Sequence, residues 1–198
     1  HIAEAPAENY PAAKFDALAL AEAARMTARQ EKWLANPVGE DCGELLLEAA
    51  RRASAVGAAI RDLEGIERAL RDIDELLRGF DERLRVDEPL ILGWVWKLLD
   101  ILRAQKVCFS AIRDYAAHGG ASRGSCIYTD ASGDCAPGLE ALFRFVPDDG
   151  RHSAEIQETV LGADGRVTSE FRPVHPLPEG GGFFENVWKR YRADRNVW

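Results

Sequence analysis

The chain has 198 residues, of which 46% are hydrophobic and 29% charged, as is ordinary for a soluble globular protein. Its net charge of -8 argues against nucleic acid as a partner, because phosphate binding requires a basic face. No apolar run approaches the ~18–20 residues that cross a bilayer, and no signal peptide is evident, so no membrane span is expected.

The four cysteines lack the closely spaced pairs on which structural zinc sites draw. They are Cys42, Cys108, Cys126 and Cys135. Only Cys126 and Cys135 are near enough in sequence for a disulfide, and the sequence leaves their pairing open. We favour free thiols in a reducing compartment, so the predicted location is cytoplasmic.

The N-terminal half has helical patterns throughout. Residues 1–13 are rich in Ala and Pro, and we interpret them as a flexible linker. Residues 15–34 predict a helix that ends before Pro37. A second helix should begin at Asp41, whose side chain can cap the following amides, with Glu44 completing a capping box.

The third helical segment has the most regular apolar pattern. Its apolar residues alternate steps of four and three, which is the a/d spacing of a helix that packs on another. They are Ile66, Leu70, Ile73, Leu77, Phe80 and Leu84. We predict packing inside a helix bundle, and a free-standing interaction protein that presents this seam to a partner helix stays open as the alternative.

A fourth, long helix is predicted from Pro89 to His118. Proline suits its first turn, and Gly119-Gly120 ends it, because glycine accepts the left-handed backbone found at helix ends. Trp94 and Trp96 lie on other faces than the main apolar one, so we expect more than one side of its first half to be buried.

Beyond residue 130 the pattern changes to strands. Residues 142–146, 154–161 and 166–174 predict short strands, and the connectors between them carry Asp-Gly, a strong hairpin signal. The stretch ASGDCAPG between the long helix and these strands has the composition of a loop. Residues 183–188 predict a short helix with an aromatic face.

The predicted fold class is α+β, mainly α. It comprises a bundle of about four helices, a small antiparallel β-meander and a short C-terminal helix. Three parts are predicted: the linker 1–13, a helical bundle domain 14–130, and a β extension 131–198 with the C-terminal helix.

No complete set of catalytic residues is visible. Motifs for a nucleophile elbow or a phosphate cradle are missing, and paired carboxylates such as Asp148 and Asp149 are expected in exposed turns. The histidines have no ligand-like spacing; they are His1, His118, His152 and His175. We therefore predict no catalytic, cofactor-binding or metal-binding residue, and a thiol or metal enzyme would need Cys126 beside His118.

The loop Ser122-Arg123-Gly124 is the candidate site, as an interdomain contact. It follows the long helix, and an arginine between small residues there can reach carbonyls or carboxylates of a neighbouring surface with its planar fork. The alternative is an arginine that fastens this domain's own helix ends.

The order of these elements resembles the C-terminal helical domain of the fumarate reductase and succinate dehydrogenase flavoprotein family. There the last long helix leads into a Glu-Ser-Arg-Gly-Ala-His motif. Ser122, Arg123 and Gly124 match it, whereas Ala121 replaces the glutamate and Ser125-Cys126 stands where Ala-His is usual. Because of these departures, succinate or fumarate is not implied as the substrate.

The tail is similar to the C-terminal end of a less characterised bacterial branch of these FAD-dependent oxidoreductases. The matching residues are Arg172, Pro173, Pro176, Phe184, Glu185, Asn186 and Trp188. The resemblance covers residues 41–130 and 171–192. It implies a parent enzyme that transfers hydride through FAD, with this chain packing on the parent's flavin-binding domain and lacking the dinucleotide-binding fold, so that the chain alone binds no FAD and catalyses nothing.

Overall fold

The fold is α+β and mainly α, as predicted. The structure is a computed structural model that describes residues 12–124, 126–135, 137–174, 188–189 and 191–193. Its elements are α1 (Ala12–Ala35), β1 (Glu40–Asp41), α2 (Cys42–Val56), β2 (Ile60–Arg61), α3 (Leu63–Arg78), α4 (Phe80–Arg83), β3 (Leu84–Arg85), η3 (Pro89–Ile91), α5 (Leu92–Ala117), β4 (Ile127–Asp134), η4 (Ala141–Phe143), β5 (Glu155–Leu161) and β6 (Val167–Pro173).

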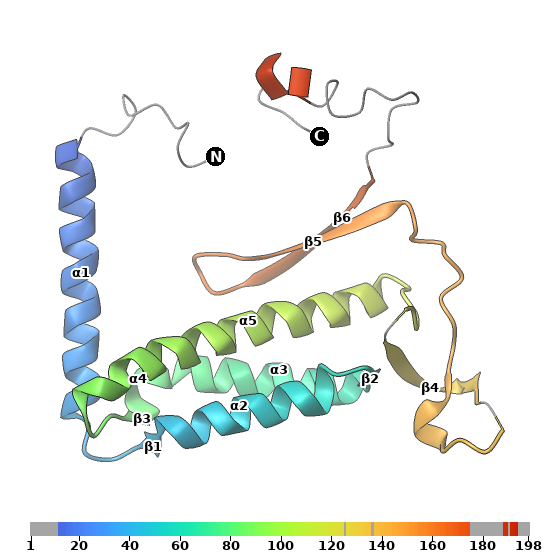
Figure 1. The fold of residues 1–198 in the computed structure, drawn as a ribbon, viewed down its shortest axis with the longest axis horizontal. Coiled ribbons are helices and arrows are strands. Elements are labelled where there is room, and N and C mark those ends of the chain that lie inside the picture. Colours follow the sequence, from blue (N-terminus) through green and yellow to red (C-terminus); the bar gives the residue numbers. More distant parts are fainter. Residues whose placement is uncertain (1–11, 125, 136, 175–187, 190, 194–198) are drawn as a thin grey trace.

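Helix α5 is the central element of the molecule (Figure 1). Helices α2 and α3 pack along one side of it, and the hairpin of β5 and β6 lies along another. Helix α1 stands at the end where α5 begins, and β4 lies at the opposite end. The observed ends of the long helix lie close to the predicted ones, Pro89 and His118, since η3 starts at Pro89 and α5 ends at Ala117.

Aspartate side chains start helices α2 and α3. Asp41 accepts hydrogen bonds from the amides of Gly43 at 2.8 Å and Glu44 at 3.1 Å, which confirms the predicted cap. Asp62 does the same for α3, and these bonds satisfy amides that have no partner within the helix.

The core lies between α2, α3 and α5. Five of the six predicted seam residues are buried there and Leu77 is partly buried, but the seam is not one helix, because α3 ends at Arg78 and α4 begins at Phe80. Because the side chains of this seam face the core, they offer no surface to a partner helix. The alternative of a free-standing interaction protein built on it is therefore not favoured.

Helix α1 is attached through one aromatic and ionic cluster. Trp33 is fully buried, with its ring centroid 6.0 Å from that of Phe80 and 5.0 Å from that of Trp96. Asp81 accepts hydrogen bonds from Trp33 at 3.0 Å and from Arg29 at 2.8 Å. Burial acts to raise the pKa of Asp81, but these hydrogen bonds outweigh it and hold the pKa below its usual value.

The hairpin confirms two of the predicted strands. Its strands pair antiparallel from Glu155↔Pro173 to Leu161↔Val167, around the predicted Asp-Gly turn. No residue of either strand is fully buried, and polar bonds attach the hairpin to α5. The bonds run from Lys106 to the carbonyl of Gly165 at 2.7 Å, from Gln157 to that of Ala111 at 2.9 Å, and from Ser169 to the carboxylate of Asp114 at 2.6 Å.

The third predicted strand is wrong. Residues 142–146 overlap η4, and Phe145 makes only isolated bridges to Thr129 and Asp134. The stretch after residue 130 has the composition of a loop, but its first residues form the end of β4. There Gly133 lies against the backbone of Phe145. A Cβ on Gly133 would fall 2.2 Å from Phe145, so this contact requires glycine, and tertiary contact overrides loop composition here.

Two further expectations need comment. Trp94 is 53% exposed, so the first half of α5 is not buried on the side of that ring, which lies under the ammonium of Lys97 at 4.7 Å. The predicted linker up to residue 11 and most of the predicted helix 183–188 lie outside the described residues. Among the described helices, none combines the length and apolarity needed to cross a membrane.

Two leucines of α2 provide a test of the core. Leu45 is 2% exposed and Leu47 is 51% exposed. We expect Leu45→Ala to lower the free energy of unfolding by about 2–5 kcal/mol, because it leaves a cavity, whereas Leu47→Ala should change it by less than about 0.5 kcal/mol. Urea unfolding followed by circular dichroism measures both, and equal losses would contradict the placement of α2.

Candidate functional site

The predicted loop is built around Ser122. This side chain is buried, and its hydroxyl oxygen accepts a hydrogen bond from the amide of Tyr128 at 2.8 Å. The backbone of Ser122 also bonds on both sides, since its amide donates to Val146 at 3.2 Å and its carbonyl accepts from Asp148 at 2.8 Å. Ser122 is therefore a fastening point between three segments, and it is not available to a ligand.

The flanks of the loop are held by separate contacts. On one side, the chain turns away from the end of α5 at Gly119, whose positive φ of 91° suits glycine. On the other side, β4 pairs parallel with β2 through Ile60↔Ile127 and Arg61↔Tyr128. The loop is thus held between the end of the long helix and the connection between α2 and α3.

Arg123 and Gly124 are exposed, in contrast to Ser122. They line a pocket of about 480 Å³ that also touches the aromatic rings of Tyr115 and Tyr128. Burial raises the pKa of Tyr128, and the guanidinium of Arg61 lies 5.8 Å from its ring centroid. This surface offers a cation, aromatic rings and an exposed backbone, which suits contact with a carboxylate or carbonyl.

Arg123 also lies near the hydrogen-bonded side chains of Tyr115 and Asp148. The hydroxyl of Tyr115 donates to the carboxylate of Asp148 at 2.6 Å. This bond, and more weakly the charge of Arg123, hold the pKa of Asp148 below its usual value. Burial and Asp148 raise the pKa of Tyr115, and Arg123 opposes them. The charge of Arg123 thus acts on the Tyr115–Asp148 pair at the end of α5, and its side chain is also exposed to solvent.

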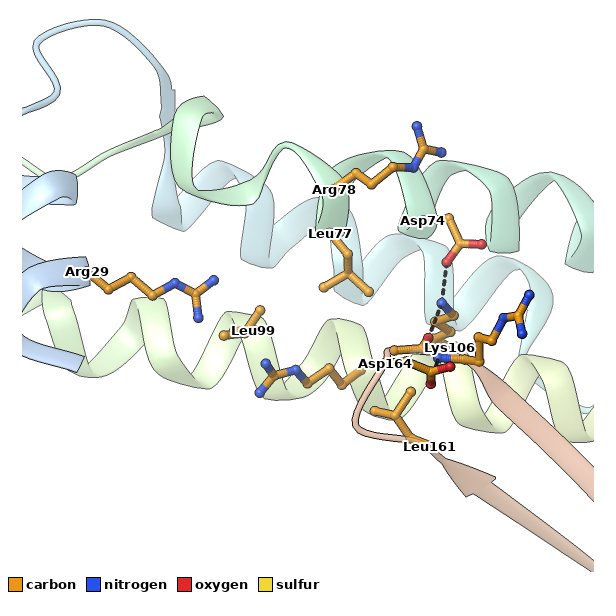
Figure 2. Close-up of a pocket in the computed structure, with 11 residues that line it drawn as sticks. Arg29, Asp74, Leu77, Arg78, Leu99, Lys106, Leu161 and Asp164 are labelled. Atoms are coloured by element: carbon orange, nitrogen blue, oxygen red, sulfur yellow. Dashed lines mark hydrogen bonds and ion pairs between the residues drawn. The ribbon is translucent and has the colours of Figure 1, made fainter. Parts of the chain in front are cut away.

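A second pocket lies between α3, α5 and the hairpin turn (Figure 2). Its volume is about 440 Å³, and Lys106 crosses its floor, with its ammonium 2.7 Å from the carboxylate of Asp74. Five cationic and two acidic side chains line it: Arg29, Arg78, Arg103, Lys106, Arg166, Asp74 and Asp164. The lining can attract an anion, and among the described residues it includes no histidine, cysteine or hydroxyl side chain.

A thiol enzyme would need Cys126 beside His118, and these two side chains bond to different partners. The thiol of Cys126 donates to the carbonyl of Arg123 at 3.3 Å, whereas His118 pairs with Glu155. All four cysteines are free in the structure, and burial raises the pKa of Cys42 to about 11, which keeps that thiol protonated.

The structure brings together three residues that the sequence gave no reason to connect: His118, His152 and Glu155. They come from the end of α5, the segment before β5 and the first residue of β5. His152 and Glu155 are only three residues apart, whereas His118 joins them only because the hairpin docks on α5.

Comparisons with known proteins support a fold relationship. No family model and no curated protein matches the chain. Among solved structures, the chain is similar to a variant of FrdA from E. coli quinol fumarate reductase, with a TM-score of 0.56 and 17% identity over 81% of this chain. It spans 26% of that FrdA chain. The likeness shows a shared fold.

The predicted resemblance to the fumarate reductase flavoproteins is therefore confirmed at the level of the fold. The position of such a domain at the C-terminal end of a parent protein stays a prediction. Ser122 is buried and fastens the loop, whereas Arg123 is exposed, so replacing the two residues should affect stability differently.

We expect Ser122→Ala to lower the free energy of unfolding by about 1–3 kcal/mol, because it leaves the amide of Tyr128 without an acceptor. Arg123→Ala should lower it by no more than about 0.5 kcal/mol in this chain, because the side chain is exposed. Guanidinium unfolding compares the two. A larger loss for Arg123→Ala would show that the arginine mainly fastens this domain.

Proposed function

We propose that the chain is the C-terminal support domain of an FAD-dependent oxidoreductase of the fumarate reductase and succinate dehydrogenase flavoprotein type. It packs on a flavin-binding domain that lies outside this chain. The observation that carries the proposal is the FrdA-like fold, which spans about a quarter of a FrdA chain and contains the long helix followed by Ser-Arg-Gly.

The structure of the loop favours a contact role. Ser122 is buried and bonded on three sides, whereas the next two residues are exposed, so the arginine is presented on a fixed backbone. A side chain on such a support loses less freedom when it binds than one on a mobile loop. Its planar fork can bond carboxylates or carbonyls of the flavin-binding domain in a bidentate manner.

The division of the chain follows from the same proposal. The bundle 14–130 supplies the rigid support, and the extension 131–198 adds the hairpin that docks along α5. The parent enzyme transfers hydride through FAD to or from a small unsaturated or carboxylated substrate. Its catalytic residues lie in the flavin-binding part, so this chain alone binds no FAD and catalyses nothing.

Flavin binding tests this division directly. We expect the isolated chain, mixed with FAD and passed through a desalting column, to retain no flavin absorbance, because its described residues form no dinucleotide-binding fold. The protein encoded by the whole reading frame should retain FAD and contain a strand-turn-helix with a Gly-rich fingerprint. Stoichiometric FAD binding by this chain alone would overturn the division.

Variants of the whole protein test the contact. Arg123→Ala should weaken the docking of the two parts by about 1.5–3 kcal/mol, because a charge-assisted hydrogen bond is lost. Arg123→Lys should give a smaller loss, since it keeps the charge but not the fork. The measured quantity is the concentration of guanidinium chloride at which the protein releases FAD.

The matched control is Arg51→Ala, which removes an exposed arginine from α2. It should leave FAD release unchanged. Equal release for wild type and Arg123→Ala would remove the loop from the interface, while leaving the FrdA-like fold unaffected.

A further inference from the structure

The cluster of His118, His152 and Glu155 lies where the end of α5 meets the hairpin. Within the described part of the chain, it is the one group of three metal-ligating side chains, and one donor atom from each falls within 4.8 Å of the others. Nε2 of His118 and Nδ1 of His152 each lie 2.9 Å from the same oxygen, Oε2 of Glu155.

These separations are close to those of a metal site. Zinc bonds of about 2.0–2.1 Å in a tetrahedron place neighbouring ligand atoms about 3.3 Å apart. A metal ion bound by all three groups therefore requires each imidazole nitrogen to move about 0.4 Å farther from Oε2 of Glu155. The two nitrogens, which lie within 4.8 Å of each other, must come to a similar separation.

Packing holds the two imidazoles in place. The ring of His118 stacks on Phe171 of β6, with centroids 3.8 Å apart and planes 9° from parallel. The ring of His152 lies 4.5 Å from that of His118, and a Cβ on Gly119 would come 3.4 Å from Nε2 of His152. Because the rings are already ordered, binding a metal costs little side-chain entropy.

The donor set selects the class of metal. Two imidazoles and one carboxylate suit zinc and neighbouring transition metals, whereas magnesium and calcium prefer oxygen ligands. The side chains of His118 and Glu155 are 34% and 36% exposed. A water molecule can therefore reach the remaining coordination position, as in three-ligand zinc sites.

We propose that His118, His152 and Glu155 form a site for a divalent transition metal ion of the zinc class. The ion joins Nε2 of His118, Nδ1 of His152 and the carboxylate of Glu155. It would crosslink the end of α5 to the start of β5, where the hairpin otherwise relies on polar bonds. The proposal is independent of the flavoprotein proposal.

The site also bears on the loop. Gly119 directly follows His118, and three residues later Ser122 accepts the amide of Asp148, which precedes His152 by four residues. The segment from His118 to Ser122 and the segment from Asp148 to His152 are thus joined at one end by this hydrogen bond. A metal ion at the cluster would join them at the other end as well. We expect metal binding to stiffen both.

Cobalt titration tests the site. His1 and His175 are replaced by alanine, which leaves only the two cluster histidines of the four in the chain. The accessible cysteines, Cys108, Cys126 and Cys135, are alkylated with the protein folded. We expect one Co²⁺ per chain, detected by weak visible absorption bands, with no intense thiolate band in the unalkylated protein. Zn²⁺ should displace the Co²⁺ and raise the midpoint of thermal unfolding.

The variants are His118→Ala, His152→Ala and Glu155→Gln. Each should weaken Co²⁺ binding by at least about tenfold, since even the loss of a group behind a ligand costs 10–100-fold. Glu170→Gln, an exposed carboxylate of β6, is the matched control and should bind like wild type. Circular dichroism checks that each variant is folded.

Two results would overturn the proposal. One is the absence of Co²⁺ bands and of any Zn²⁺-dependent thermal shift at millimolar metal. The other is Co²⁺ binding to folded Glu155→Gln and His118→Ala that equals binding to the control, which would place the metal elsewhere on the chain.

Discussion

The structure depends on the two unlike faces of α5. One face is apolar and packs in the core against α2 and α3, through residues such as Val95, Leu99 and Leu102. The other face is polar and holds the hairpin through Lys106, Asp114 and the carbonyl of Ala111. A single helix therefore joins a hydrophobic bundle to a hairpin whose strands have no fully buried residue.

This arrangement places the candidate loop and the histidine cluster at one end of the helix. The last fully buried apolar residue of α5 is Phe109, and several polar contacts follow it: Asp114 with Ser169, Tyr115 with Asp148, and His118 with Glu155. Polar contacts are directional, so they fix the loop and the hairpin at defined positions. They are also the contacts that a partner domain or a metal ion can strengthen or replace.

The sequence predicted what local rules decide. Asp41 caps α2, Pro89 starts the turn before α5, and the Asp-Gly turn joins β5 to β6, because each depends on residues close in the chain. It failed where a distant segment decides. Strand β4 exists because its backbone pairs with residues of β2 and bridges Phe145, and the stretch ASGD carries no strand signal by itself.

The candidate site shows the same division. Composition could not separate the members of the tripeptide: Ser122 lies in the interior, where it accepts the amide of Tyr128, and Arg123 lies on the surface. Likewise His118 gains its neighbours only from the docked hairpin. If a metal ion holds that docking, it also fixes the distance between Ser122 and Asp148, and with it the surface that presents Arg123. The proposed contact with a flavin-binding domain and the proposed metal site would then act through the same few residues at the end of α5.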